Sequence, residues 1–402
     1  MKPKFTVFIV FLFIFASSAF AQGIANDIKL DTMKKYLKEL TGTSYYNLNG
    51  NTYRITTRTT THNDIVTAEN YLKFRLRSYG LNVIEQPFTY GGANTNARNI
   101  LAVQIGSQFP DQKYIICAHF DAVSGSPGAN DNGSGTVTVL EAARIISKLN
   151  PKYTILYALW SGEEQGLQGS NYYAAQAFTN SEKIKGVINI DMIGDGNNFN
   201  DLMLYSVTSL TSPLIDNLVA INTSYGINTS IIKNYTMEGG SDHYPFYLKG
   251  YPAYLLIEKD PRGDPTYHNS TDTYANINFT FFEKCAKLAI LSLAELSGAV
   301  NNPNPVEEFT SLPTELILHQ NYPNPFNPST VISYDLKEGS NVRLQVYDAL
   351  GREVKTLVNE YKPAGNHRVL FSVESSSATS GVYFYKLQTG ASMMMKKMVY
   401  LK

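Results

Sequence analysis

The chain has 402 residues, with 34 Lys and Arg side chains against 34 Asp and Glu side chains, and 12% of its residues are aromatic. Balanced charge provides no net field that would attract nucleic acid or an acidic membrane surface, and this aromatic content is typical of well-packed globular domains. Two cysteines, Cys117 and Cys285, are too few for a disulfide scaffold. The sequence therefore predicts a globular protein, long enough for two domains, that does not bind nucleic acid.

The first 21 residues are typical of a signal peptide. Lys2 and Lys4 precede an apolar run from Phe5 to Phe15, and Ala19-Phe20-Ala21 supplies the small residues that a signal peptidase requires. We expect cleavage after Ala21. The run is too short to favour a lasting membrane span, and no later stretch reaches the necessary ~20 apolar residues. The sequence therefore predicts an exported protein with no stable membrane span.

Residues 22–302 alternate between helical and strand-like patterns, and we expect them to form one domain. Helices are predicted at residues 27–40, 67–79 and 137–149, and strands at residues 82–88, 97–105, 113–117, 153–160, 186–190 and 254–257. The last three strands are near-continuous apolar runs, as in strands covered on both faces. This alternation predicts an α/β fold with a mixed, mostly parallel sheet and helices on both faces.

Acidic or imidazole side chains follow these strands, at the carboxyl ends where open α/β sheets keep their ligand sites. They are His119, Asp121, Asp131, Glu163, Glu164, Asp191 and His268. His119 and Asp121 are two residues apart, so on an extended backbone they point to the same side and the carboxylate can steady the imidazole. Asp131 stands in a Gly-rich loop that enters the helix at 137–149.

Two imidazoles and three carboxylates among these residues are the ligand types of a hydrolytic zinc pair. One carboxylate in such a pair bridges two ions about 3.5–4 Å apart. Asp131 is the natural bridge, because its Gly-rich loop places little bulk around it. Glu163 and Glu164 face opposite ways on an extended backbone, so one can bind metal while the other faces the water nucleophile.

Five segments resemble, in order, the motifs of the M28 family of zinc aminopeptidases. They are His119-x-Asp121, Asn130-Asp131-Asn132-Gly133-Ser134-Gly135, Glu163-Glu164, Asp191-Met192 and His268-Asn269-x-x-Asp272-Thr273. Together they span most of residues 95–300. The resemblance implies a zinc-exopeptidase-like fold and a secreted aminopeptidase, with peptide or protein N-termini as its substrates.

The resemblance also implies a role for each residue. Two Zn²⁺ ions are expected, with His119 and Asp191 on one, Glu164 and His268 on the other, and Asp131 as the bridge. Glu163 falls at the position of the general base, and Asp121 at the carboxylate behind His119. A strained peptide bond is expected between Asp131 and Asn132.

Three alternative functions remain open at this point. A carboxypeptidase or dipeptidase would need a basic residue for the substrate carboxylate, and Arg262 is the nearby candidate. A glutaminyl cyclase shares the fold but uses one zinc, and the presence of all five ligands argues against it. A non-catalytic surface binding protein is disfavoured by the intact Glu163.

One departure from the family leaves the group that stabilises the oxyanion open. Secreted relatives can carry a cysteine pair and a tyrosine just before the segment Ser241-Asp242-His243, where this chain has Met237-Glu238-Gly239-Gly240. Tyr235 and Tyr244 are the candidates that the sequence offers instead.

The composition changes after residue 302. Residues 303–313 are rich in Pro and polar residues and are expected to be a linker. Residues 314–402 contain short alternating runs bounded by turn signals, with strands predicted at 330–336, 341–347, 368–373, 381–387 and 396–401. This pattern predicts a small all-β, Ig-like sandwich domain.

Residues 314–402 also have a resemblance of their own. The motifs Asn321-Tyr322-Pro323-Asn324-Pro325-Phe326-Asn327-Pro328, Val346-Tyr347-Asp348-x-x-Gly351-Arg352 and Gly381-Val382-Tyr383-Phe384 are similar to the C-terminal sorting domain of type IX secretion cargo. The resemblance implies the type IX secretion machinery as a partner and a final location outside the cell or on its surface, reached via the periplasm. A generic Ig-like spacer is the alternative.

Overall fold

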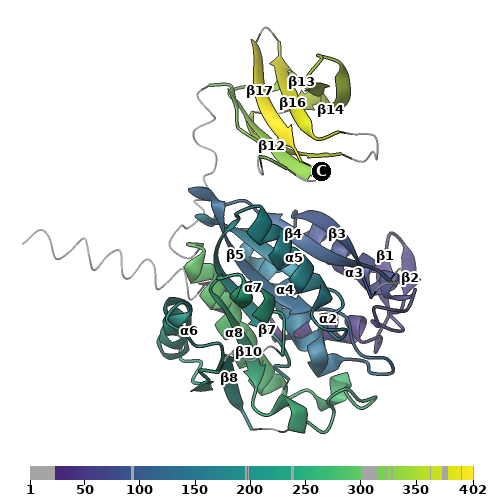
Figure 1. Cartoon of the computed structure of the whole chain (residues 1–402), viewed down its shortest axis with the longest axis vertical. Coiled ribbons are helices and arrows are strands. Elements are labelled where there is room, and N and C mark those ends of the chain that lie inside the picture. Colours follow the sequence, from purple (N-terminus) through teal and green to yellow (C-terminus); the bar gives the residue numbers. More distant parts are fainter. Residues whose placement is uncertain are drawn as a thin grey trace, which may run out of the picture. The chain divides into compact units, whose positions relative to one another are not determined.

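The computed structural model describes residues 23–91, 95–194, 197, 199–236, 240–299, 315–321, 324–326, 329–362, 364–373, 379–390 and 392–401. The expected signal peptide and linker lie outside these residues. The chain divides into two compact units, Met1–Pro303 and Asn304–Lys402 (Figure 1). No helix in the described parts of the chain is both long and apolar enough to span a membrane.

An eight-stranded sheet forms the centre of the first unit, with strand order β3-β4-β6-β5-β7-β10-β8-β9 (Figure 1). Its strands are β3 (Asn82–Tyr90), β4 (Thr95–Gln104), β5 (Phe109–His119), β6 (Tyr153–Trp160), β7 (Lys183–Ile190), β8 (Asp201–Tyr205), β9 (Ser230–Lys233) and β10 (Ala253–Glu258). The central strands β6, β5, β7 and β10 are parallel to their neighbours in that row. Strand β4 pairs antiparallel with β3 and β6, and β8 pairs antiparallel with β10. The predicted mixed, mostly parallel sheet is confirmed.

Helices cover both faces of this sheet. They are α2 (Leu30–Leu40), α3 (Ile65–Ser78), α4 (Gly135–Ile146), α5 (Gln168–Thr179), α6 (Ser212–Ser224), α7 (Tyr244–Leu248) and α8 (Phe279–Leu296). Side chains alternate along β5: Ile116 and Ala118 join the core that contains residues of α4 and α8, whereas Ile115 and Cys117 join the core beside α5 and α7. The central strands are therefore buried on both sides, which explains their continuous apolar sequences.

The second unit contains two antiparallel sheets over one apolar core. Sheet order is β11-β12-β15 in one and β14-β13-β16-β17 in the other. The strands are β11 (Ile317–Leu318), β12 (Ser329–Leu336), β13 (Ser340–Asp348), β14 (Glu353–Lys362), β15 (Gly365–Ser372), β16 (Gly381–Thr389) and β17 (Ser392–Tyr400). Residues from both sheets, among them Tyr334, Leu344 and Tyr385, fill the core. The predicted all-β class is confirmed.

Candidate metal centre

The parallel arrangement of β5, β6, β7 and β10 brings the predicted site residues together. His119 is the last residue of β5, Glu163 and Glu164 follow β6, and Asp191 directly follows β7. His268 lies in the loop after β10. Since these strands are neighbours that run the same way, their carboxyl ends meet at one edge of the sheet, and that edge carries the site.

Asp131 lies between the two imidazoles. Its Oδ1 atom is 3.3 Å from Nε2 of His119, and its Oδ2 atom is 3.2 Å from Nε2 of His268. Nε2 of His119 is also 3.4 Å from Oδ1 of Asp191, and Nε2 of His268 is 2.9 Å from Oε2 of Glu164. The five predicted ligands therefore form two sets that share Asp131, with one carboxylate oxygen directed at each set.

These side chains fit a metal better than they fit one another. Nε2 of His119, Oε1 of Glu164 and Oδ1 of Asp191 are buried and have no hydrogen-bond partner. A buried polar atom without a partner costs about 1–3 kcal/mol, more when charged, and metal coordination removes that cost. Ligand atoms of His119, Asp131 and Glu164 lie within 4.8 Å of one another, as do those of His119, Glu163 and Asp191. The nitrogen and oxygen donors suit zinc.

Crowding of acids shapes the electrostatics of the site. Burial raises the pKa of Glu164 to about 8, and the Asp131 carboxylate adds to the effect. Burial also raises the pKa of Glu163 well above its usual range, with Asp191, Asp242 and Asp131 contributing in the same direction. The pKa of His119 is raised because the Glu163 and Asp191 carboxylates outweigh its burial. An excess of buried negative charge is an environment that favours bound cations.

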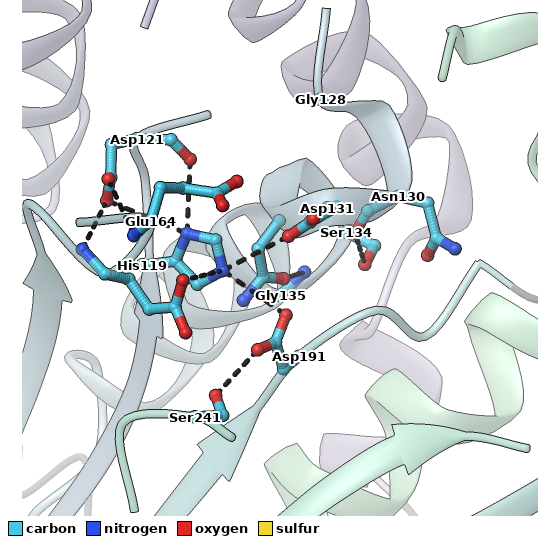
Figure 2. A network of polar contacts seen from close by, with 12 residues as sticks. His119, Asp121, Gly128, Asn130, Asp131, Ser134, Gly135, Glu164, Asp191 and Ser241 are labelled. Carbon is cyan, nitrogen blue, oxygen red and sulfur yellow. Dashed lines mark hydrogen bonds and ion pairs between the residues drawn. The ribbon is translucent and has the colours of Figure 1, made fainter. Parts of the chain in front are cut away.

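Asp121 contacts both His119 and the paired glutamates. Nδ1 of His119 lies 3.2 Å from the backbone oxygen of Asp121, and 3.7 Å from its carboxylate (Figure 2). The carboxylate instead accepts hydrogen bonds from the backbone N–H groups of Glu163 and Glu164, each at 3.3 Å, and from Thr60 Oγ1 at 3.1 Å. Asp121 therefore orients the imidazole through its main chain and holds the paired glutamates through its side chain.

A chain of buried side chains orients Asp191. Ser241 Oγ donates a hydrogen bond to Oδ2 of Asp191 at 2.6 Å, as Figure 2 shows, and accepts one from Asn189 at 2.8 Å. Cys117 Sγ lies 3.4 Å from Oδ1 of Asn189. Cys117 and Cys285 are both buried, and neither forms a disulfide. The Ser241 hydroxyl leaves Oδ1 of Asp191 directed at His119.

Two residues to which the sequence analysis assigned no role position the loop of Asp131. The Asp272 carboxylate accepts hydrogen bonds from the backbone N–H groups of Asn130 at 2.7 Å and Asp131 at 3.0 Å. The buried Arg58 guanidinium donates to four carbonyls, those of Phe120 (2.6 Å), Pro127 (2.7 Å), Gly128 (2.7 Å) and Leu40 (3.5 Å). The peptide bond between Asp131 and Asn132 is cis, consistent with the strained bond that the family resemblance implied.

A pocket opens beside the two ligand sets. Asp131, Glu163, Asp191 and His268 line one side, and the other residues that line it are Met192, Tyr205, Gly240, Leu255, Ile257, Pro261, Arg262 and Tyr267. Residues 237–239 lie outside the described chain.

The tyrosines of this pocket differ from those that the sequence offered. Tyr235 and Tyr244 are not among its lining residues, whereas Tyr205 and Tyr267 are. Burial, together with the nearby Asp131 and Glu164, raises the pKa of Tyr267 to about 12, so its hydroxyl stays protonated and can donate a hydrogen bond into the pocket. Its position next to the expected ligand His268 was the one sequence signal that could have identified it.

Solved structures with a similar fold include two kinds of enzyme. The LapA aminopeptidase of Legionella pneumophila aligns with a TM-score of 0.58 and 26% identity, over 69% of this chain and 74% of that chain. A glutaminyl cyclase of Porphyromonas gingivalis aligns with a TM-score of 0.54 over 67% of this chain and 99% of that one. Its 19% identity shows a shared fold alone.

Sequence comparison identifies both units. The chain is 28% identical over 256 residues to a probable zinc metalloprotease of Leptosphaeria maculans, a match that covers 52% of this chain and 59% of that protein. It spans little more than half the length of the curated relatives it matches. Residues 99–293, which include every predicted site residue, match the model of peptidase family M28, and residues 320–401 match that of the secretion system C-terminal sorting domain. The chain therefore carries a peptidase family M28 domain followed by a secretion system C-terminal sorting domain.

Proposed function

We propose that this protein is an exported di-zinc aminopeptidase. The observation that carries the proposal is the position of Asp131, whose two carboxylate oxygens face the imidazoles of His119 and His268 at 3.3 and 3.2 Å. One ion would be held by His119, Asp191 and Asp131, and the other by His268, Glu164 and Asp131. Zinc in such a site lowers the pKa of a water molecule and polarises the substrate carbonyl.

Glu163 is the proposed general base. Its carboxylate is largely buried and lies 3.8 Å from Nε2 of His119, beside the ligand sets. Its raised pKa suits a group that takes a proton from water and returns it to the leaving amine at neutral pH. The backbone N–H of Glu163 donates a hydrogen bond to the Asp121 carboxylate, and this bond holds the backbone at Glu163 in place.

Tyr267 and the acidic side chains of the pocket are the proposed substrate-binding groups. The protonated Tyr267 hydroxyl is the proposed donor to the oxygen that becomes negative during attack on the carbonyl. The carboxylates of Asp131 and Asp191 line the same pocket and attract a free α-amino group. A positive amine bound beside the reacting carbonyl restricts cleavage to the first peptide bond, which is aminopeptidase action.

The C-terminal unit supports export. Because residues 320–401 match a secretion system C-terminal sorting domain, we propose the type IX secretion machinery as its partner and a location outside the cell or on its surface. The expected signal peptide would supply the first step, into the periplasm.

Metal content and turnover test the enzymatic proposal together. The purified full chain should contain close to two zinc ions per molecule and should release p-nitroaniline from leucine p-nitroanilide. A chelator should abolish this activity, and added zinc should restore it. Cyclisation of an N-terminal glutamine with one zinc per chain would favour the glutaminyl cyclase instead, and activity that persists in metal-free protein would refute the mechanism.

A further inference from the structure

We propose that Arg262 makes this enzyme selective for substrates that carry a carboxylate close to the cleaved bond, such as the free α-carboxylate of a dipeptide. This inference rests on the proposed aminopeptidase function and names the substrate class of the same pocket. Two observations carry it: Arg262 lies in the lining of the pocket, and its guanidinium has no partner among the described residues.

Arg262 lines the pocket that Asp131, Glu163, Asp191 and His268 also line. No other Arg or Lys is present among the described residues of that lining. The side chain is exposed, and within the described chain its guanidinium makes no ion pair or hydrogen bond. A guanidinium presents donors in a rigid fork that matches a carboxylate, so an unpaired one beside a substrate pocket is available to bind that group.

The backbone around Arg262 is held in place. Gly263 N–H donates to the Asp260 carbonyl at 3.0 Å, and Asp264 N–H donates to the Pro261 carbonyl at 3.3 Å. The buried Asp264 carboxylate accepts from Thr266 N–H at 2.7 Å and from the Asn130 amide at 3.0 Å. The turn that presents Arg262 is thus tied to the loop of Asp131, so the backbone at Arg262 has a defined position relative to the metal ligands.

The chemistry of the remaining wall indicates which carboxylate would bind. Met192, Leu255 and Ile257 form an apolar cluster with Tyr205 and Tyr267, and this wall suits an apolar side chain rather than a charged one. An N-terminal apolar residue placed against it leaves the next residue nearer the pocket mouth. In a dipeptide, that next residue carries the free α-carboxylate. An acidic N-terminal side chain is the other source of the same chemistry.

Four substrates distinguish these sources in the full-length protein. Leu-Leu is compared with Leu-Leu amide, which lacks the terminal charge, and glutamate p-nitroanilide is compared with leucine p-nitroanilide. In Arg262→Ala, the kcat/KM ratio of Leu-Leu to its amide should fall about two- to fivefold, as expected for loss of an ion pair at an exposed site. Arg262→Lys should recover part of the ratio. A fall confined to the glutamate to leucine anilide ratio would assign the carboxylate to the side chain.

A control variant separates a local effect from a general loss of charge. Arg77 is exposed on α3 and does not line the pocket, so Arg77→Ala should leave both ratios at the wild-type values. If Arg262→Ala hydrolyses all four substrates with wild-type ratios, the inference is overturned while the proposed function stands. If the wild-type chain hydrolyses none of the four substrates, the proposed aminopeptidase function is refuted, and the inference about Arg262, which rests on that function, is refuted with it.

Discussion

Substitution of the paired glutamates separates proton transfer from metal binding. Glu163→Gln keeps the size and shape of a side chain that is only 11% exposed, and its amide oxygen can still accept a hydrogen bond. The amide cannot take a proton from water, so the step assigned to Glu163 is lost. General-base catalysis contributes about 10²–10⁴-fold, which corresponds to roughly 3–5 kcal/mol at 1.36 kcal/mol per tenfold. We expect kcat to fall by that factor with KM and zinc content nearly unchanged.

Glu164→Gln should instead lower the zinc content of the protein. Oε2 of Glu164 lies 2.9 Å from Nε2 of His268, and its Oε1 is buried with no hydrogen-bond partner. An amide is a weaker zinc ligand than a carboxylate, so this variant should lose about one zinc per chain after dialysis. Kinetics with leucine p-nitroanilide give kcat, and metal analysis of the same preparations by mass spectrometry gives the number of zinc ions per chain.

A third variant controls for the chemical change itself. Glu283 lies on α8, half-exposed and paired with Lys287 at 2.7 Å, and such i,i+4 pairs are worth about 0.3–0.5 kcal/mol. Glu283→Gln should match the wild-type chain in both measurements. The assignment is reversed if Glu163→Gln loses zinc while Glu164→Gln retains both ions. General-base catalysis from Glu163 is excluded if Glu163→Gln remains fully active.

Three further predictions concern the groups around the ligands and the second unit. Arg58→Leu leaves four carbonyls without the donor that they share, so the free energy of unfolding measured in urea should fall by at least about 3 kcal/mol. Arg58→Lys, which lacks the fork of donors, should recover little of that free energy. Ser241→Ala removes the donor to Asp191 and should weaken zinc affinity about 10- to 100-fold, as judged by competition with a chelator, whereas Ser270→Ala, at an exposed hydroxyl, should not. A chain that ends at Asn302 should keep its turnover but remain in the periplasm, and normal export of that chain would show that residues 314–402 are not the sorting signal.

The central sheet could be predicted because its strands are buried on both sides. Burial on two faces demands continuous apolar runs, and those at 153–160, 186–190 and 254–257 correspond to β6, β7 and β10. Strand β14 was missed for the opposite reason. Most residues of Glu353–Lys362 are exposed, so few of its positions need an apolar residue and no alternation of apolar and polar residues marks the strand. Helix α8 was missed because its residues from Leu288 to Ala294 are all buried, and a largely apolar run of that length does not distinguish a helix from a buried strand.

The predicted ligands lie together because each stands at the end of a strand or in a loop that follows one, and strand ends can be read from the sequence. Their supporting residues cannot be found in this way. Arg58 and Asp272 are 73 and 141 residues from Asp131, and their roles depend on hydrogen bonds that only the folded chain creates. The same holds for Tyr267, whose polar environment comes from acids on three other loops.

The residue before Asp131 explains how three of these loops keep one geometry. Oδ1 of Asn130 accepts from Gly194 N–H at 2.7 Å, in the loop that carries Asp191, and its amide nitrogen donates to Glu258 at the end of β10 and to Asp264 at 3.0 Å, in the loop that carries His268. A single side chain thus links the bridging ligand to one partner of each ion. Aspartate in this position would face Glu258 and Asp264 with like charge, and a smaller residue would remove the hydrogen bonds that both carboxylates accept from the Asn130 amide. An amide both donates and accepts, so Asn130 can make the contacts with Gly194, Glu258 and Asp264 at once. These three contacts account for Asn130 beside Asp131 on structural grounds alone.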